Sequence, residues 1–389
     1  SRSQVLNLVL SAERGVEGSL QAKLSRVYDG RVIPNLEANA LIRRGATTVS
    51  LSALSGRNDN AEQGYDLLRD VTTGALVERR TKINRYAPRN PSLALNTSWE
   101  PAANRAAHLN LRWAPGSFAI YQTNRVEPAG RPQRDDRLYA DYHQPGYEAG
   151  GDMTLPPAGG AIKAVVLANR RDADTYDANF NRLGGANVGG YEQFSHSRYD
   201  ELAGRLIWTR AQLAGMAVEL GGEVASNTLT DASQLYALNG SGARVPVILP
   251  VANATVSELR GEGWVQAGRA LGRNLRLDAR LAYERSSLEV SGDATTHRSL
   301  GFLKPSLTLD WKGAGGWHAQ ASLRRTVAQL NFFDFIANAE LASGQISGGN
   351  ANLFPQRAWE GRLTLDHPLL GKGLAKLELG YDRVSALQD

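Results

Sequence analysis

The chain has 389 residues, with no cysteine, 2 methionines and 40 glycines. The lack of cysteine excludes a disulfide scaffold and a thiolate-ligated zinc or iron–sulfur site. The formal net charge of +5 is small and spread along the chain, which argues against a nucleic-acid partner.

Apolar residues make up 42% of the chain, but no apolar run reaches the roughly 18 residues that a membrane helix needs. A helical membrane protein is therefore excluded. A membrane β-barrel is not, because its lipid-facing side chains alternate with lumen-facing ones and keep the mean hydropathy low. Residues 1–4 show neither an initiator Met nor the start of a secretion signal, and we expect the sequence to begin inside a longer protein.

Strict alternation of apolar and polar residues is the main structural signal, and it predicts strands with two unlike faces. In residues 107–113, Leu109, Leu111 and Trp113 alternate with His108, Asn110 and Arg112. In chain order the pattern predicts strands near 19–27, 34–43, 47–57, 88–99, 106–126, 146–156, 161–172, 197–209, 213–226, 255–269, 275–288, 297–311, 317–328, 355–367 and 374–386. This makes about fifteen strands.

Proline interrupts two of the predicted strands. Pro305 lies inside one alternating segment, and Ala114, Pro115 and Gly116 lie inside another. Because proline lacks the N–H that a strand donates, we expect a bulge or a local break at both places.

The predicted connections alternate between short and long. Short ones follow residues 99, 156, 209, 269, 311 and 367, and long polar ones cover 57–88, 126–146, 172–197, 226–255 and 328–355. Outer-membrane barrels have short periplasmic turns and long extracellular loops. Five tryptophans, Trp99, Trp113, Trp208, Trp311 and Trp317, are expected near the short turns as an interfacial girdle. A soluble sandwich or propeller is less consistent with strands of ten or more residues.

The segment from Arg324 to Glu360 resembles the late-barrel signature of TonB-dependent outer-membrane receptors. An Arg-led strand is followed by Gly349, Asn350, Ala351, Asn352, Leu353, Phe354, Pro355 and Gln356, where the family usually has Gly-Asn-Pro-x-Leu-x-Pro-Glu. Ala351 and Gln356 depart from that pattern. Residues 4–10 look like a final plug strand, and residues 220–223 resemble a mid-barrel Gly-x-Glu strand.

The resemblance implies a 22-stranded antiparallel barrel in the Gram-negative outer membrane, and energised uptake of a scarce solute. We expect residues 1–14 to be the end of a plug domain and residues 15–389 to be the barrel, with the C-terminal strands, most of the plug and the TonB box outside this sequence. An odd strand number fits an incomplete wall, because closed single-chain bacterial barrels have an even number. The implied partners are the lipid bilayer, TonB and a small-molecule ligand, the expected state is a monomer, and no cofactor is implied. Asn350, Asn352, Leu353 and Pro355 are expected to shape a loop.

Tyrosine and arginine concentrate in two neighbouring predicted long loops. They combine large contact area with directional donors, as ligand-binding surfaces do, although packing within the loops would explain them equally well. The candidates for ligand binding are Tyr139, Tyr142, Arg171, Arg182 and Tyr191. The arginines favour an anionic ligand such as a ferric siderophore, with a cobamide or a saccharide as alternatives.

Motifs for catalysis or metal binding are weak. The six histidines lack the spacing of a metal site, and no Gly-x-Ser-x-Gly elbow occurs, so we expect no enzyme. Asp172, Asp174 and Asp177 form an oxygen-rich cluster that could hold Ca²⁺, but a solvated loop explains them better. His108 and His318 are expected to line the lumen. A passive porin or an adhesin-type barrel remains the alternative function.

Overall fold

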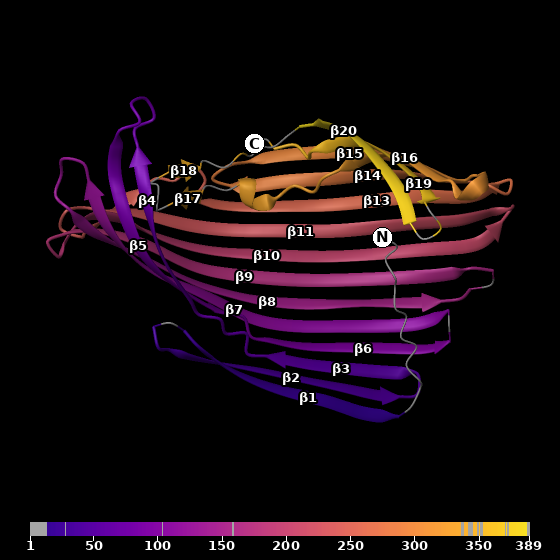
Figure 1. The fold of residues 1–389 in the computed structure, drawn as a ribbon, viewed down its shortest axis with the longest axis horizontal. Coiled ribbons are helices and arrows are strands. Elements are labelled where there is room, and N and C mark those ends of the chain that lie inside the picture. Colours follow the sequence, from indigo (N-terminus) through magenta and orange to yellow (C-terminus); the bar gives the residue numbers. More distant parts are fainter. Residues whose placement is uncertain are drawn as a thin grey trace.

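The computed structural model describes residues 14–27, 29–102, 104–157, 159–335, 338–340, 345–347, 350, 353–369, 371 and 373–386. Most of these residues lie in antiparallel strands that follow one another in space in chain order (Figure 1). No helix in these ranges has the length and apolar character needed to cross a membrane.

Eighteen strands form one sheet, and two more form a separate pair. The first half of the sheet contains β1 (Gly15–Arg26), β2 (Val32–Arg44), β3 (Thr47–Leu54), β4 (Asn60–Arg69), β5 (Leu76–Arg89), β6 (Ser92–Ala102), β7 (Arg105–Pro128), β8 (Arg134–Leu155), β9 (Ala161–Leu183) and β10 (Ala186–Leu213). The second half contains β11 (Met216–Leu238), β12 (Arg244–Val247), β13 (Asn253–Leu271), β14 (Leu275–Gly292), β15 (Thr296–Lys312), β16 (His318–Val327), β19 (Arg357–Leu369) and β20 (Gly373–Ser385). The separate pair is β17 (Asn338–Glu340) and β18 (Gln345–Ser347), and two short 3-10 helices cover Ala314–Gly316 and Phe332–Phe335.

The prediction of about fifteen wall strands is confirmed for the described residues, once interrupted strands are counted as one and the short β12 is left out. β3 pairs with β6 while β4 pairs with β5, so these four segments form one long hairpin whose two arms are each interrupted once. β12 adds only four residues beside the end of β11. Figure 1 shows β4 and β5 projecting beyond the other strands at one end of the sheet. Among the described residues, β1 pairs only with β2, and β20 only with β19, so the sheet has two edges.

The two faces of the sheet differ, as the alternation predicts. Leu51, Leu95 and Leu111 lie side by side in register on one face. His108 and Arg112 lie on the opposite face, where they pair with Asp152 and Glu148. We call these the apolar face and the polar face.

The apolar face carries a band of limited height. On β10 it runs from Trp208 to Leu202 and ends at Asp200, which forms an ion pair with Arg170 of β9 at 2.8 Å. About eight residues of strand cover roughly 27 Å along its axis. At the tilt usual in barrels this corresponds to about 20 Å of height, close to the apolar band of about 25 Å expected for an outer-membrane barrel.

Beyond the apolar band, several strands continue where long loops were expected. Residues 134–146, 172–183 and 186–197 are paired strand rather than loop, so those loop predictions were wrong. The reason is physical: above the band both faces contact water, so the polar–apolar alternation disappears while the backbone ladder continues. The actual connections at this end are as short as the one between Leu183 and Ala186.

The local breaks expected at proline occur on one side of each strand only. β7 pairs with β8 without a register shift through Pro115, opposite Pro145. On its other side, β7 pairs with β6 up to Trp113 and with β5 from Ser117 onward. The N–H that Pro115 lacks therefore falls in the gap between these two ladders. Pro305 likewise pairs in register with β14, and the ladder to β16 ends at the residue after it.

Four of the five girdle tryptophans lie near short turns, as predicted, but Trp113 does not. It lies well along β7, opposite Tyr147 of β8, near the far limit of the apolar band. The sequence could not show this, because Trp113 lies just before Pro115, where a bulge or a local break was predicted. Trp113 and Tyr147 instead mark the second boundary of the band.

Candidate functional site

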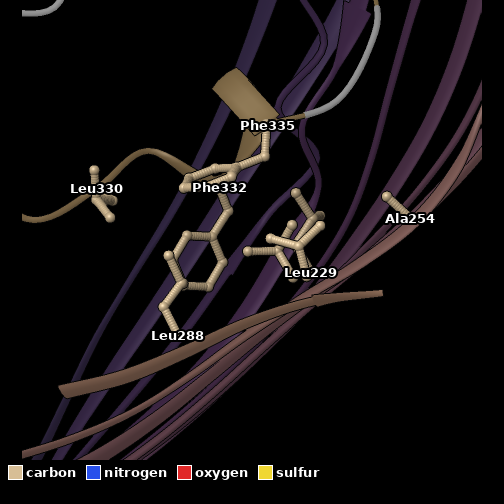
Figure 2. Packing of buried hydrophobic residues seen from close by; sticks show 8 residues of the cluster. Leu229, Ala254, Leu288, Leu330, Phe332 and Phe335 are labelled. Atoms are coloured by element: carbon tan, nitrogen blue, oxygen red, sulfur yellow. The ribbon is translucent and has the colours of Figure 1, made fainter. Parts of the chain in front are cut away.

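The polar face is covered, beyond the apolar band, by two segments that fold back onto it. The first surrounds the 3-10 helix at Phe332–Phe335. Phe332, Phe335 and Leu330 form a buried cluster with residues from β11, β13 and β14, and Figure 2 shows them lying over Leu229 and Leu288 of the wall. The members from the wall are Leu229, Ala254, Val256, Leu288 and Val290.

This docked segment, residues 330–335, is held by close packing. Phe335 is fully buried, and its ring meets that of Phe332 edge-on with 6.3 Å between centroids. Phe332 also meets Tyr199 of β10 edge-on at 6.4 Å. Residues 330–335 were predicted as part of a long polar loop, although two adjacent phenylalanines there were a signal that the segment buries an apolar surface.

The second inward segment follows β12. Leu249 packs against Leu235 of β11, with Tyr191 of β10 beside them. The backbone N–H of Ser233 donates to the carbonyl of Ala252 at 2.7 Å, which fixes this segment to the wall. Both inward segments therefore lie at the same end of the polar face.

An aromatic group also lies on the polar face, on β5, β7 and β8. The rings of Tyr86 and Phe118 stack at 5.9 Å between centroids, and Phe118 lies 5.9 Å from Tyr142. The Tyr142 hydroxyl donates to Oδ1 of Asp177 on β9 at 2.8 Å. Burial raises the pKa of Asp177 above its usual 3.8. Burial also raises the pKa of the Tyr142 hydroxyl, so Tyr142 remains a donor.

Replacing Asp177 with asparagine is expected to reduce the loss of stability with rising pH. A carboxyl group whose pKa is higher in the folded state binds its proton more tightly there, so stability falls as pH rises from about 3.8 through the raised pKa. Asparagine cannot ionise and still accepts the Tyr142 hydrogen bond, so the variant should be the more stable protein above that window. Thermal midpoints between pH 3.5 and 7 measure this. Asp174→Asn, on the exposed part of the same strand, is the control, and an equal change there would contradict the prediction.

The five residues predicted to bind a ligand divide between the two faces. Tyr142, Arg171 and Tyr191 lie on the polar face, and register places Arg171 opposite Tyr199, beside the docked segment. Tyr139 and Arg182 lie on the face that continues the apolar one. Tyr142, Arg171 and Tyr191 can therefore share a site on the polar face, and Tyr139 and Arg182 a different one on the opposite face, because successive residues of a strand point to opposite sides.

The aspartates proposed for Ca²⁺ do not converge. Asp172 pairs with Arg198 at 2.6 Å and Asp174 with His196 at 2.6 Å, both on the face that continues the apolar one. Asp177 points to the polar face toward Tyr142. Across the described ranges no three His, Asp or Glu side chains are placed to hold a metal ion. The three aspartates therefore do not form one cluster, because a strand separates side chains that a loop could have gathered.

The motif residues connect the docked segment to β19. The backbone N–H of Asn350 donates to the carbonyl of Asp334 at 2.9 Å, and Leu353 packs against the buried cluster. Nη1 of Arg298 donates to the Leu353 carbonyl at 3.0 Å, and Pro355 is buried just before β19 begins. Asn352 lies outside the described residues, as do residues 1–13 with the predicted plug strand.

The half of the polar face nearer the short turns is lined by ion pairs. Lys304 of β15 bonds to Glu262 of β13 and Glu284 of β14. His318 bridges two carboxylates, with Asp366 at 3.0 Å and Asp310 at 2.8 Å. His108 and His318 thus lie on the polar face, as predicted.

A hollow of about 1010 Å³ is a different feature. It runs across the apolar face at the limit of the band, and its lining includes Ala38, Leu51, Trp113 and Leu202. Its position among exposed apolar side chains fits contact with hydrocarbon, so we do not assign a ligand to it.

The wall can be compared with solved structures. It is similar to the copper transporter OprC, with 12% identity and a TM-score of 0.52 over 92% of this chain. The chain has the fold of an outer-membrane β-barrel wall. It spans about half of the OprC chain, 52%. The translocator domain of the autotransporter NalP from Neisseria meningitidis shares 13% identity over 73% of this chain and 83% of that domain, with a TM-score of 0.27.

No protein-family model and no curated protein matches the chain. Within the barrel fold, the polar face faces the lumen and the apolar face is directed outward. The docked segment, the second inward segment and the Tyr142 group therefore lie inside the wall, at the end opposite the short turns.

Proposed function

We propose that the chain is the wall of a TonB-dependent transporter in the Gram-negative outer membrane. The fold, the apolar band and the polar lumen support a membrane location. Strands β7 to β11 extend far beyond the band at one end only, and this supports the orientation with the turns at the other end in the periplasm. On this proposal residues 1–14 are the end of a plug domain and residues 15–389 belong to the barrel. The plug and the TonB box would belong to the same protein.

The observation that carries the proposal is the pair of inward segments at the extracellular end. They narrow the lumen and bring the Phe332 cluster beside Tyr199, with exposed Arg171 directly opposite in the neighbouring strand. Tyr191 contributes to the second segment. A site with aromatic contact area and a guanidinium donor suits an anionic organic ligand, for which a ferric siderophore is our first candidate.

Arg171→Gln is expected to weaken ligand binding at least about tenfold, because it removes one charge-assisted contact worth roughly 1.5–3 kcal/mol. The test is uptake of radiolabelled ferric siderophores by a deletion strain that carries the complete reading frame. OprC is named a copper transporter, so copper is assayed in parallel. Arg198→Gln is the matched control, because Arg198 lies close to Arg171 in the sheet but on the outward face.

Energy dependence separates the two functional classes. Uptake that stops when TonB is removed supports the proposal. Uptake that continues without TonB, at a rate proportional to solute concentration, would identify a passive porin. Equal losses for Arg171→Gln and Arg198→Gln would remove the lumen site from the proposal.

A further inference from the structure

A row of aromatic rings crosses five strands on the outward face, beyond the apolar band. We call it the aromatic ladder, and it consists of Tyr121, Tyr139, Tyr176, Phe194 and Tyr236. The centroids of neighbouring rings are separated by 5.1, 5.7, 4.8 and 6.3 Å in that order. Burial raises the pKa of Tyr139 to about 12, so its hydroxyl stays protonated.

Arginines flank the ladder at both ends. The Arg85 guanidinium lies 5.6 Å from the centre of the Tyr121 ring, and that of Arg244 lies 5.2 Å from the Phe194 ring and 5.7 Å from the Tyr236 ring. Arg244 is also paired with Glu192 at 2.6 Å, so its charge is balanced. The Arg85 end is different.

At that end lies a cavity of about 590 Å³, which we call the arginine pocket. Arg85, Arg137 and Arg182 line it together with Tyr121 and Tyr139, and no carboxylate belongs to its lining. Arg85 reaches Asp59 only at 3.5 Å. The Nε atoms of Arg85 and Arg182 are buried without a hydrogen-bond partner. Three guanidinium groups in one cavity favour an anion with several oxygen acceptors, such as a phosphate.

The height of the pocket restricts its occupant. Tyr139 lies about eight residues beyond Tyr147, which marks the limit of the band, and this is roughly 27 Å along the strand or about 20 Å along the membrane normal. Phospholipid headgroups extend only about 5–8 Å beyond the hydrocarbon. The outward face at this height can be reached by a membrane lipid only if the lipid has a long polar headgroup. Sugar rings can also pack their C–H faces on tyrosine rings.

We propose that the arginine pocket and the aromatic ladder bind the phosphorylated oligosaccharide of a glycolipid in the surrounding outer leaflet. The inference depends on the outer-membrane location in the proposed function, but not on the transported solute. The arginines hold the phosphate groups and the ladder packs against the adjoining sugars. This contact would fix the long extracellular strands relative to the membrane surface.

The test measures binding of lipopolysaccharide with a phosphorylated core to the purified full-length protein by microscale thermophoresis. The double variant R137Q/R182Q is expected to bind at least about tenfold more weakly, because two charge-assisted contacts are lost. Tyr139→Leu, which leaves the three arginines in place, is expected to weaken binding by roughly fivefold through loss of stacking. Arg69→Gln, at the exposed tip of the β4–β5 hairpin, is the charge-matched control and should bind like the wild type.

Three comparison ligands identify the occupant. Dephosphorylated lipopolysaccharide and lipid A without its core should each bind at least about tenfold more weakly, and inorganic phosphate should compete only at far higher concentration. Equal binding of either lipid, or of R137Q/R182Q, overturns the proposal. Circular dichroism checks that each variant keeps its strands. If R137Q/R182Q does not, the proposal is judged on Tyr139→Leu instead. If the protein fails to fractionate with the outer membrane, the proposed function fails. If it fractionates there but does not discriminate these lipids, only this inference fails.

Discussion

Phe335→Ala is expected to release the docked segment from the lumen wall. The Phe335 side chain is fully buried among Phe332, Leu229 and the apolar residues of β13 and β14. Truncating a buried phenylalanine costs about 3–5 kcal/mol through lost burial and the cavity that remains. A segment of this length has few other contacts to offset that loss, so its local opening should become frequent.

Hydrogen–deuterium exchange of residues 328–335 measures the opening directly. Phe333 is a matched control in the same 3-10 helix, because its side chain is 51% exposed and Phe333→Ala should change exchange little. Strands β11, β13 and β14 should keep their protection in both variants. If Phe333→Ala and Phe335→Ala increase exchange equally, packing against the wall does not hold the segment.

Gly221→Val is expected to destabilise the wall by about 1–3 kcal/mol, because it overfills a close contact inside the lumen. A Cβ atom at Gly221 would overlap the indole ring of Trp264 on the neighbouring strand. That ring cannot move freely, since its Nε1–H donates to Glu219 at 2.7 Å and the Arg280 guanidinium lies 4.7 Å from its centre. Valine would therefore displace the ring or separate β11 from β13.

Gly222→Val provides the control one residue away. Gly222 points outward, and a Cβ atom there would lie 3.7 Å from the nearest atom, the Glu262 carbonyl oxygen, which is an ordinary contact. Thermal midpoints followed by circular dichroism should fall for Gly221→Val and stay close to the wild type for Gly222→Val. A larger fall for Gly222→Val would show that the outward face, and not the Trp264 contact, limits stability here.

The strand pattern was predictable wherever one face of the sheet differs from the other. Leu109, Leu111 and Trp113 alternate with His108 and Arg112 because the two environments of the wall select different side chains. His318 was placed on the polar face for the same reason. Beyond the apolar band that selection ends, and the strand residues around Tyr139 and Tyr176 were predicted as loops.

The candidate site was only partly predictable. Tyr142, Arg171 and Tyr191 were identified as residue types suited to ligand binding, and they lie on the lumen face. Tyr139 and Arg182 were placed in the same set, yet they point outward. In a strand, successive side chains point to opposite faces, but this rule could not be applied to a segment that was predicted to be a loop.

The sequence by itself determined that the chain forms long antiparallel strands with one apolar and one polar face, because apolar and polar residues alternate along each strand. Only the tertiary structure decided that residues 330–335 fold onto the lumen wall and that the aromatic ladder assembles on the outward face. The docked segment joins residues far apart in the chain, as Phe335 joins Leu229, and the ladder joins rings from five successive strands, as Tyr121 joins Tyr139. Such contacts depend on the register between strands, which hydrogen bonding and packing across the whole sheet fix together.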